Sequence, residues 1–179
     1  MFERYSELAR LAVFIAYKEA REIGNGSIDT EHLLIGILTV HPELPNQLAV
    51  EFDAASARTQ SPHSDASRPA LSLQSAVDLP VTSDLKRVMK HAMSVADLQQ
   101  CREIRTEHLF ASLIVEGGHA ATILAPFQIE KQAMAIISEI DCSKPQKSTE
   151  ASRQAMSSIQ QMFSDRSDQQ TPEERGGSA

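Results

Sequence analysis

One nine-residue stretch occurs twice in this chain, and that repetition constrains the fold more than any other feature. Residues 30–38 read Thr-Glu-His-Leu-Leu-Ile-Gly-Ile-Leu, and residues 106–114 read Thr-Glu-His-Leu-Phe-Ala-Ser-Leu-Ile. Sliding the chain by 76 positions keeps the copies in register, without a gap, over residues 5–38. Because two copies are too few for a solenoid, the sequence predicts a compact domain with internal pseudo-two-fold symmetry.

Each copy has the pattern of a buried helix start. Thr30 and Thr106 are predicted to cap their helices with a hydroxyl oxygen, while Glu31 and Glu107 place negative charge at the positive end of the helix dipole. For the histidine in third place we expect a packed imidazole that hydrogen-bonds the preceding loop or the sister repeat. No metal is expected, because adjacent Glu and His side chains point about 100° apart on a helix.

The periodicity of apolar residues predicts an all-α fold, an eight-helix pseudo-two-fold bundle of two four-helix repeats. The low aromatic content of 4%, with no Trp, also favours a helical core over a β-sandwich. The expected helices cover approximately residues 3–23, 31–40, 46–52 and 53–58, and then 83–99, 107–115, 120–125 and 129–140.

Shifts in composition predict the domain boundaries. A Ser-, Ala-, Pro-, Arg- and Gln-rich stretch has the character of a mobile linker between the repeats. The expected organisation is a domain over residues 1–142, made of repeat one (1–55), the linker (56–78) and repeat two (79–142), and then a polar extension over 143–179.

The extension contains one further helical pattern. Apolar residues share one face of a predicted amphipathic helix over residues 149–163, and residues 165–179 are expected to form a disordered tail. The apolar face of this helix either packs on the domain or serves as a docking peptide, and the sequence leaves both alternatives open.

Charge argues against nucleic acid as a partner. The net charge is −7, and residues 1–53 alone carry four basic and nine acidic groups, which is −5. No clustered basic face of the kind that binds nucleic acid is visible. The acidic first repeat favours cationic peptides or basic adaptor surfaces.

Cysteine usage and the absence of targeting signals indicate the compartment. Cys101 and Cys142 follow neither metal-ligand nor redox-motif spacing, so two reduced thiols are expected, with a disulfide left open. The first residues do not resemble a signal peptide, and the apolar run at 11–17 is too short to span a membrane. The sequence therefore predicts a soluble, cytoplasmic protein without a membrane partner.

The start Met-Phe-Glu-Arg, the Gly-Asn turn after the first helix and the two Thr-Glu-His-Leu copies resemble the N-terminal double Clp repeat domain of ClpA- and ClpC-type AAA+ unfoldases. The resemblance covers residues 1–142. It implies an eight-helix pseudo-dimer without enzymatic activity, at which adaptors and substrates dock before an ATPase ring threads them into a protease. The implied partners are Clp ATPase or protease components, adaptor proteins and substrate peptides, and no cofactor is implied.

The resemblance also implies two kinds of site. In ClpC-type members the start of each Thr-Glu-His helix is similar to a site for phosphorylated arginine, which maps here to Thr30, Glu31, Thr106 and Glu107. Helix N-terminal N–H groups suit a phosphate and a carboxylate suits a guanidinium, although a first-turn glutamate also simply stabilises a helix.

A protein-docking groove between the repeats is the second implied site, and Phe2, Arg10 and Val81 fall on its positions. The alternative for Phe2 is a residue that merely closes the core. The family's Gly-rich stretch after the second helix is replaced by His-Pro-Glu-Leu-Pro at residues 41–45, which predicts degraded distal helices in repeat one.

No Gly-x-x-x-x-Gly-Lys-Ser/Thr motif occurs in the sequence, and none of its seven glycines precedes a lysine. The expected function is therefore a non-catalytic protein-binding module in regulated proteolysis, a receptor without the motor. One alternative is a metal enzyme that uses Glu31, His32, Glu107 and His108. Another is a structural protein, no longer linked to Clp, that oligomerises through residues 149–163.

Overall fold

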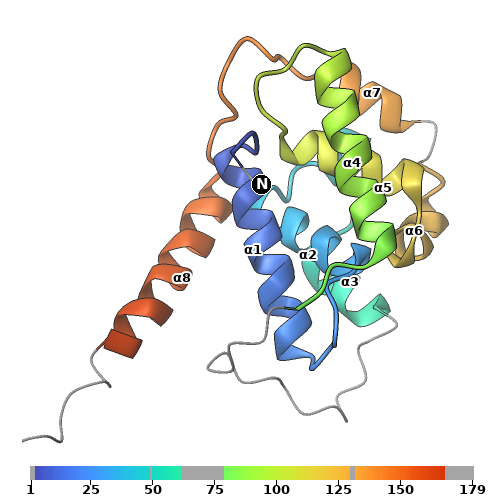
Figure 1. Ribbon diagram of the computed structural model, residues 1–179. Coiled ribbons are helices and arrows are strands. Elements are labelled where there is room, and N and C mark those ends of the chain that lie inside the picture. The colour runs from blue at the N-terminus through green and yellow to red at the C-terminus, as the bar shows by residue number, and fades with distance from the viewer. Residues whose placement is uncertain (1–2, 49, 62–78, 130–131, 168–179) are drawn as a thin grey trace, which may run out of the picture.

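A computed structural model describes residues 3–48, 50–61, 79–129 and 132–167, which form helices and no strand (Figure 1). The prediction of an all-α fold is confirmed. The α-helices are α1 (Glu7–Glu22), α2 (Thr30–Val40), α3 (Ala54–Gln60), α4 (Ser83–Leu98), α5 (Thr106–Glu116), α6 (His119–Leu124), α7 (Ala133–Ser138) and α8 (Glu150–Ser167). Two short 3-10 helices, η1 (Pro45–Leu48) and η2 (Ala125–Phe127), complete the described elements.

The repeat offset is visible in the helix boundaries. Shifting α1 by 76 positions reproduces the bounds of α4, and the same shift takes α2 onto α5. The caps correspond as well, because Ser6 Oγ accepts the Ala9 N–H at 3.2 Å and Thr82 Oγ1 accepts the Leu85 N–H at 3.3 Å. The first helix therefore begins at Glu7, four residues after its predicted start, because a capping serine precedes it.

The two repeats are tied together by symmetric backbone hydrogen bonds. Ser6 N–H donates to Ile104 O at 2.9 Å, and Thr82 N–H donates to Ile28 O at 3.0 Å. Isolated parallel bridges pair Tyr5 with Ile104 and Ile28 with Val81. In each case the residues before one repeat's long helix pair with the loop before the other repeat's Thr-Glu-His helix. The pseudo-two-fold axis thus relates two interlocked units.

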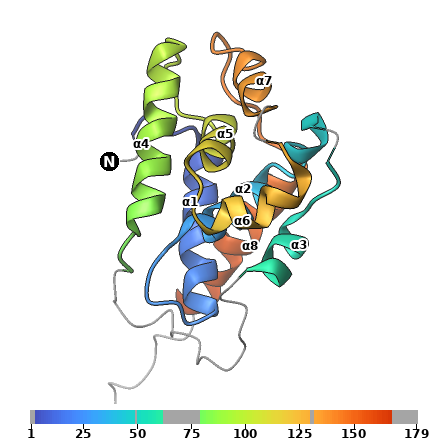
Figure 2. The same cartoon turned by 90° about the vertical axis from the view of Figure 1, so that its right-hand side faces the viewer.

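The Thr-Glu-His helices α2 and α5 form the centre of the core. They contact each other, while α1 packs on α2 and α4 packs on α5 (Figure 2). Leu34, Ile37, Leu109 and Leu113 are all fully buried. No single described helix is long and apolar enough to cross a membrane, although Thr106–Glu116 and His119–Phe127 reach that length and composition together across an 87° bend.

The distal part of repeat one differs from the prediction. The helix expected over 46–52 is only the 3-10 turn η1, which begins at Pro45 and ends at Leu48. The next helix forms as α3, with Asp53 Oδ1 accepting the Ser56 N–H at 2.8 Å and Ala57 buried. Residues 56–60, predicted as linker, are therefore helical, and residues 62–78 lie outside the described residues.

The amphipathic helix of the extension is present as α8, which begins one residue after the predicted start and continues past residue 163. Of the two alternatives for its apolar face, the structure shows packing on the domain. Ser152 is buried, and Ala155, Met156 and Ile159 pack against the core. The first turns of α8 lie beside α1, and its later turns extend away from the bundle (Figure 1). Residues 165–167, predicted as tail, belong to α8, while 168–179 are outside the described residues.

The prediction of two reduced thiols is wrong, and the disulfide that the sequence left open is present. Cys101 and Cys142 form a disulfide with their Cα atoms 4.9 Å apart, a separation that such a bond requires. The bond joins the loop before α5 to the chain after α7. Spacing in sequence could not show this, because the two residues meet only when helices α4 to α7 have packed.

Candidate functional site

The first Thr-Glu-His start is capped by residues other than the predicted threonine. Asp29 is the N-cap, and its side chain accepts the Thr30 N–H at 2.6 Å. His32 Nδ1 accepts the Asp29 backbone N–H at 3.0 Å, which is the role that Glu or Gln plays in a capping box. Thr30 is the first helical residue, and its hydroxyl oxygen accepts the Ala120 N–H of α6 at 3.1 Å. Thr30 thus connects the repeats and does not cap its own helix.

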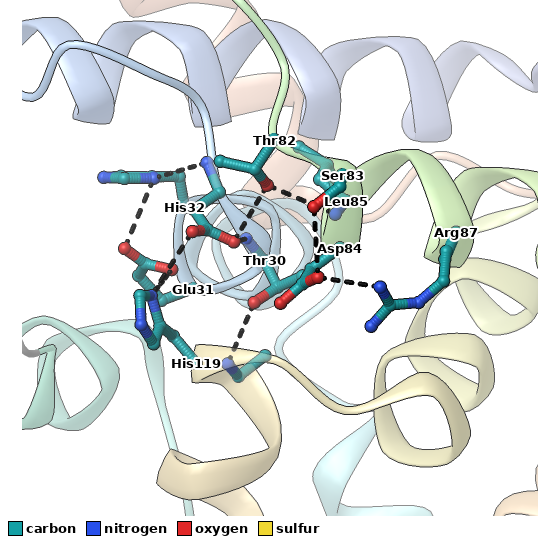
Figure 3. A network of polar contacts seen from close by, with 11 residues as sticks. Thr30, Glu31, His32, Thr82, Ser83, Asp84, Leu85, Arg87 and His119 are labelled. Carbon is teal, nitrogen blue, oxygen red and sulfur yellow. Dashed lines mark hydrogen bonds and ion pairs between the residues drawn. The ribbon is translucent and has the colours of Figure 1, made fainter.

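Glu31 is fully buried in a cluster of charges between the repeats (Figure 3). His119, the first residue of α6, places Nδ1 3.3 Å from Glu31 Oε2 and 3.3 Å from Asp29 Oδ2. Thr82 Oγ1 donates to the other Asp29 oxygen at 3.1 Å. One carboxylate oxygen each of Asp29 and Glu31 and one ring nitrogen of His119 all lie within 4.8 Å of one another. This cluster joins the start of α2 to α6. Because Glu31 is fully buried beside His119, its carboxylate is closed to a ligand in this arrangement.

The second start repeats the histidine geometry. His108 Nδ1 accepts the Arg105 backbone N–H at 2.9 Å, and His108 is fully buried. The interpretation of both histidines as packed residues that hydrogen-bond the preceding loop is confirmed. Burial lowers the pKa of His108 to about 4, and the positive charge of Arg105 contributes to the shift.

The structure gives no support to a metal site at these histidines. Because Nδ1 of His108 accepts a hydrogen bond, Nε2 carries the proton, and it lies 2.9 Å from Gln99 Oε1. Cys101 and Cys142 lie within 4.8 Å of His108, but their sulfurs are joined to each other. Neither nitrogen of His108 is therefore available as a ligand while its capping hydrogen bond persists.

The surroundings of the second start differ from those of the first. Glu107 is half-buried, and its Oε2 accepts hydrogen bonds from Thr106 Oγ1 at 3.1 Å and from Gln146 Nε2 at 2.5 Å. Thr106 is fully buried, and its hydroxyl oxygen also contacts Gln146 Nε2 at 2.5 Å and His41 Nδ1 at 2.9 Å. Sequence reasoning did not identify Gln146, because a glutamine in a polar extension belongs to no motif.

An apolar cavity of about 400 Å³, which we call the groove, lies between α1 and α4 where the protein-docking site was predicted. Of the three residues expected there, Arg10 and Val81 both line it, and Phe2 lies outside the described residues. The walls come from both repeats and consist mainly of apolar side chains, among them Val13, Phe14, Tyr17, Leu85 and Met89. Phe14 is 38% exposed, so the groove presents apolar surface to solvent.

A second cavity lies between α1 and α8. Its volume is about 360 Å³, and Met156 and Ile159 of α8 line it. Arg10 and Phe14 of α1 line both this cavity and the groove. The extension therefore adjoins the groove predicted to dock protein.

Comparison with known proteins identifies related chains. The sequence profile of the Clp repeat (R) N-terminal domain matches residues 4–127. The chloroplastic chaperone protein ClpD of Arabidopsis thaliana is 28% identical over 136 residues, which cover 69% of this chain and 14% of that protein. The ClpA homolog of Guillardia theta, an ATP-binding subunit of the ATP-dependent Clp protease, is 30% identical over 129 residues, 69% of this chain and 15% of that subunit. This chain therefore matches only a small part of either relative.

A solved structure supports the fold. The crystal structure of the N-terminal domain of the caseinolytic protease associated chaperone ClpD from Arabidopsis thaliana superposes with a TM-score of 0.62 at 23% identity. The match covers 77% of this chain and 94% of that domain. The fold described above is thus similar to the fold of that domain.

Proposed function

The chain belongs to the Clp repeat (R) N-terminal domain family, and from this premise we propose that it is a non-catalytic protein-binding module that recognises adaptors, substrates or Clp components in regulated proteolysis. The matched relatives are named as a chaperone and as an ATP-binding subunit of a protease, and this chain aligns with about a seventh of each. The proposal assigns to this chain the docking step and no ATP hydrolysis.

The observation that carries the proposal is the groove between α1 and α4. Its volume of about 400 Å³ falls in the range of binding pockets. Apolar side chains from both repeats line it, and the exposed guanidinium-bearing Arg10 lies at its side. Such a surface suits a peptide with an apolar anchor and a neighbouring carboxylate, because a desolvated apolar contact supplies most of the binding energy and a charged pair orients it.

The Thr-Glu-His starts are the second part of the proposal. Thr30 and Glu31 are fully buried and engaged by α6, so we assign them to holding the repeats together. The half-buried Glu107 is closer to solvent than Glu31, and its carboxylate offers acceptors to a guanidinium. We therefore place phosphoarginine recognition at the start of α5.

The groove is tested with fluorescently labelled β-casein, an unfolded protein rich in apolar segments, by fluorescence anisotropy. Met89→Glu introduces a charge into the groove, and we expect it to weaken binding about tenfold or more, the effect of losing one principal anchor. Met93→Glu is the matched control, because Met93 lies one turn further along α4 and is 42% exposed outside the groove. Equal affinities of the two variants for β-casein would contradict the proposal.

The alternative of an oligomer formed through residues 149–163 is not favoured by the structure. Ala155, Met156 and Ile159 of α8 pack against the chain's own core. Molar mass measured by light scattering for the full chain and for a chain ending at residue 148 tests this alternative. We expect both to have the same number of subunits.

A further inference from the structure

The two Thr-Glu-His starts are related by pseudo-symmetry, yet different parts of the chain cover them. At the first start, Ala120 N–H of α6 donates to Thr30 Oγ1 at 3.1 Å. Leu44 is the repeat equivalent of Ala120, and its N–H donates to His41 O at 3.3 Å instead. Repeat one has the 3-10 turn η1 where repeat two has α6, and none of its described backbone N–H groups donates to Thr106, whose contact from repeat one is the His41 side chain, with Nδ1 2.9 Å from Thr106 Oγ1.

The C-terminal extension adds a further donor at the second start. Gln146 Nε2 contacts both Thr106 Oγ1 and Glu107 Oε2 at 2.5 Å. On its other side, Gln146 Oε1 accepts the Ser6 hydroxyl at 2.6 Å. The amide nitrogen is therefore engaged at the start of α5 and the amide oxygen at the start of α1. The contacts join the extension to both repeats across about 40 and 140 positions of sequence.

The segment that carries Gln146 is anchored at both ends. Cys142 is held by its disulfide to Cys101, and Thr149 Oγ1 donates to Val40 O at 2.5 Å. Arg105 Nη2 donates to Asp141 O at 2.8 Å and also to Lys144 O. Residues 143–148, which we call the lid segment, thus cross over the second start between two fixed points.

We propose that the lid segment is an intramolecular cover for the site formed by Thr106 and Glu107, and that Gln146 occupies the position of an incoming N–H donor. This inference rests on the ligand site of the proposed function and adds its regulation. A neutral amide donates to the Glu107 carboxylate more weakly than a guanidinium does, because charge-assisted hydrogen bonds are roughly twice as strong. A cationic N–H donor can therefore displace Gln146, whereas a neutral peptide amide has no such advantage.

The cover is tested without any ligand by carboxyl labelling. Carbodiimide-activated coupling of glycine ethyl ester, followed by mass spectrometry, reports how accessible Glu107 is to solvent. We expect Gln146→Ala to raise the labelling rate of Glu107 about five- to tenfold, as for a site that is covered most of the time. The matched control is Gln154→Ala, since Gln154 is an exposed glutamine on α8, and it should leave the rate unchanged. Melting curves of the variants establish that each is folded.

A titration with free phosphoarginine by calorimetry separates the cover from its ligand. Faster labelling of Glu107 together with tighter phosphoarginine binding by Gln146→Ala supports both proposals. Faster labelling with no binding by either chain supports the cover and contradicts phosphoarginine as the ligand. An unchanged labelling rate in Gln146→Ala overturns the cover, whatever the titration shows.

Discussion

His108 is a buried imidazole whose two nitrogens have fixed and different roles. Nδ1 accepts the Arg105 N–H, and the protonated Nε2 faces Gln99. A second proton on Nδ1 would replace this hydrogen bond with a clash of two donors, next to a cationic side chain. The neutral form is thus the form that fits the fold, in agreement with a pKa of about 4.

We predict a pH-dependent loss of stability from this residue. The pKa of histidine is about 6.5 in an unfolded chain, so between pH 6.5 and 4 the unfolded state binds a proton that the folded state does not. Stability is therefore complete above pH 6.5 and falls as the pH approaches 4, by about 3 kcal/mol from this group. Urea unfolding at several pH values measures it.

His108→Gln is the matched variant, because glutamine at this position keeps a capping acceptor and does not titrate. Burial also lowers the pKa of His41, which adds a loss in the same direction to both chains. The difference between wild type and variant therefore isolates His108. Parallel stability curves for the two chains from pH 7.5 to 4 would show that His108 is not held neutral.

Residue roles at the helix starts were only partly predictable. A threonine before an apolar run can occupy either the N-cap or the first helical position, and the sequence does not distinguish these two positions. Thr30 and Thr106 are first helical residues, which moves each histidine to the third position where its Nδ1 meets the N-cap N–H. The prediction of packed histidines is confirmed despite this one-residue difference. It depended on the apolar residues that follow each histidine and not on which residue is the N-cap.

At the scale of elements, Gly36 permits the close crossing of α1 and α2. A Cβ added there would lie 2.1 Å from the Ala12 carbonyl oxygen, which is backbone and cannot rotate away. The equivalent position in repeat two holds Ser112, whose Oγ lies 2.9 Å from His91 Nδ1. The two helix pairs therefore meet through different contacts despite their shared boundaries.

We predict that Gly36→Ala lowers the free energy of unfolding by about 1–3 kcal/mol, because overpacking outweighs the better helix propensity of alanine. Gly26→Ala is the control, since nothing lies within 4 Å of a Cβ built at Gly26. Its effect should stay within about 0.5 kcal/mol. Chemical denaturation of the wild type and the two variants measures the free energies of unfolding. A Gly36→Ala chain as stable as wild type would rule out the close crossing of α1 and α2.

The disulfide makes a separate prediction. Its cysteines are 41 positions apart, and closing a loop of that size restricts the unfolded chain by about 4 kcal/mol in the chain-entropy account. We expect no reactive thiol in the denatured, unreduced protein, and roughly 2–4 kcal/mol less stability after reduction. Two titratable thiols and no effect of reductant would contradict the bond.

This bond also bears on the compartment. Stable disulfides are rare in reducing cytosol. The cytoplasmic location was predicted partly from the expectation of free thiols, and that support is removed. Location remains a prediction, for which the oxidation state of Cys101 and Cys142 in cells is the relevant measurement.

Elements with a strong apolar stripe were well predicted, as the bounds of α2, α4 and α5 show, while α1 was predicted to begin four residues too early. In the distal part of repeat one, α3 lies within two residues of the helix predicted over 53–58, whereas the helix predicted over 46–52 is only the turn η1. In α3 a single buried alanine faces the core, so its hydrophobic pattern is weak and only the Asp53 cap indicated a helix. The turn η1 ends at Leu48 although residues 46–52 contain no proline, and nothing in the structure explains its early end.

For the whole molecule, the repeat offset in the sequence was sufficient to predict the pseudo-two-fold symmetry. It could not show that the repeats interlock through Tyr5, Ile28, Val81 and Ile104, because bridges between distant segments leave no local pattern. The coverage of the second start by Gln146 was hidden for the same reason. Arg10 and Val81 were placed at a docking groove because of the resemblance to the Clp repeat domain. The periodicity of apolar residues did not indicate a groove.

The central claim is that this domain binds unfolded protein segments in the groove between α1 and α4. Hydrogen–deuterium exchange with and without saturating β-casein, read by mass spectrometry, locates the binding surface directly. We predict slower exchange with β-casein in peptides from residues 7–22 and 83–98, retained in Met93→Glu and lost in Met89→Glu. Unchanged exchange in both peptides, or slowing confined to other helices, would contradict the claim.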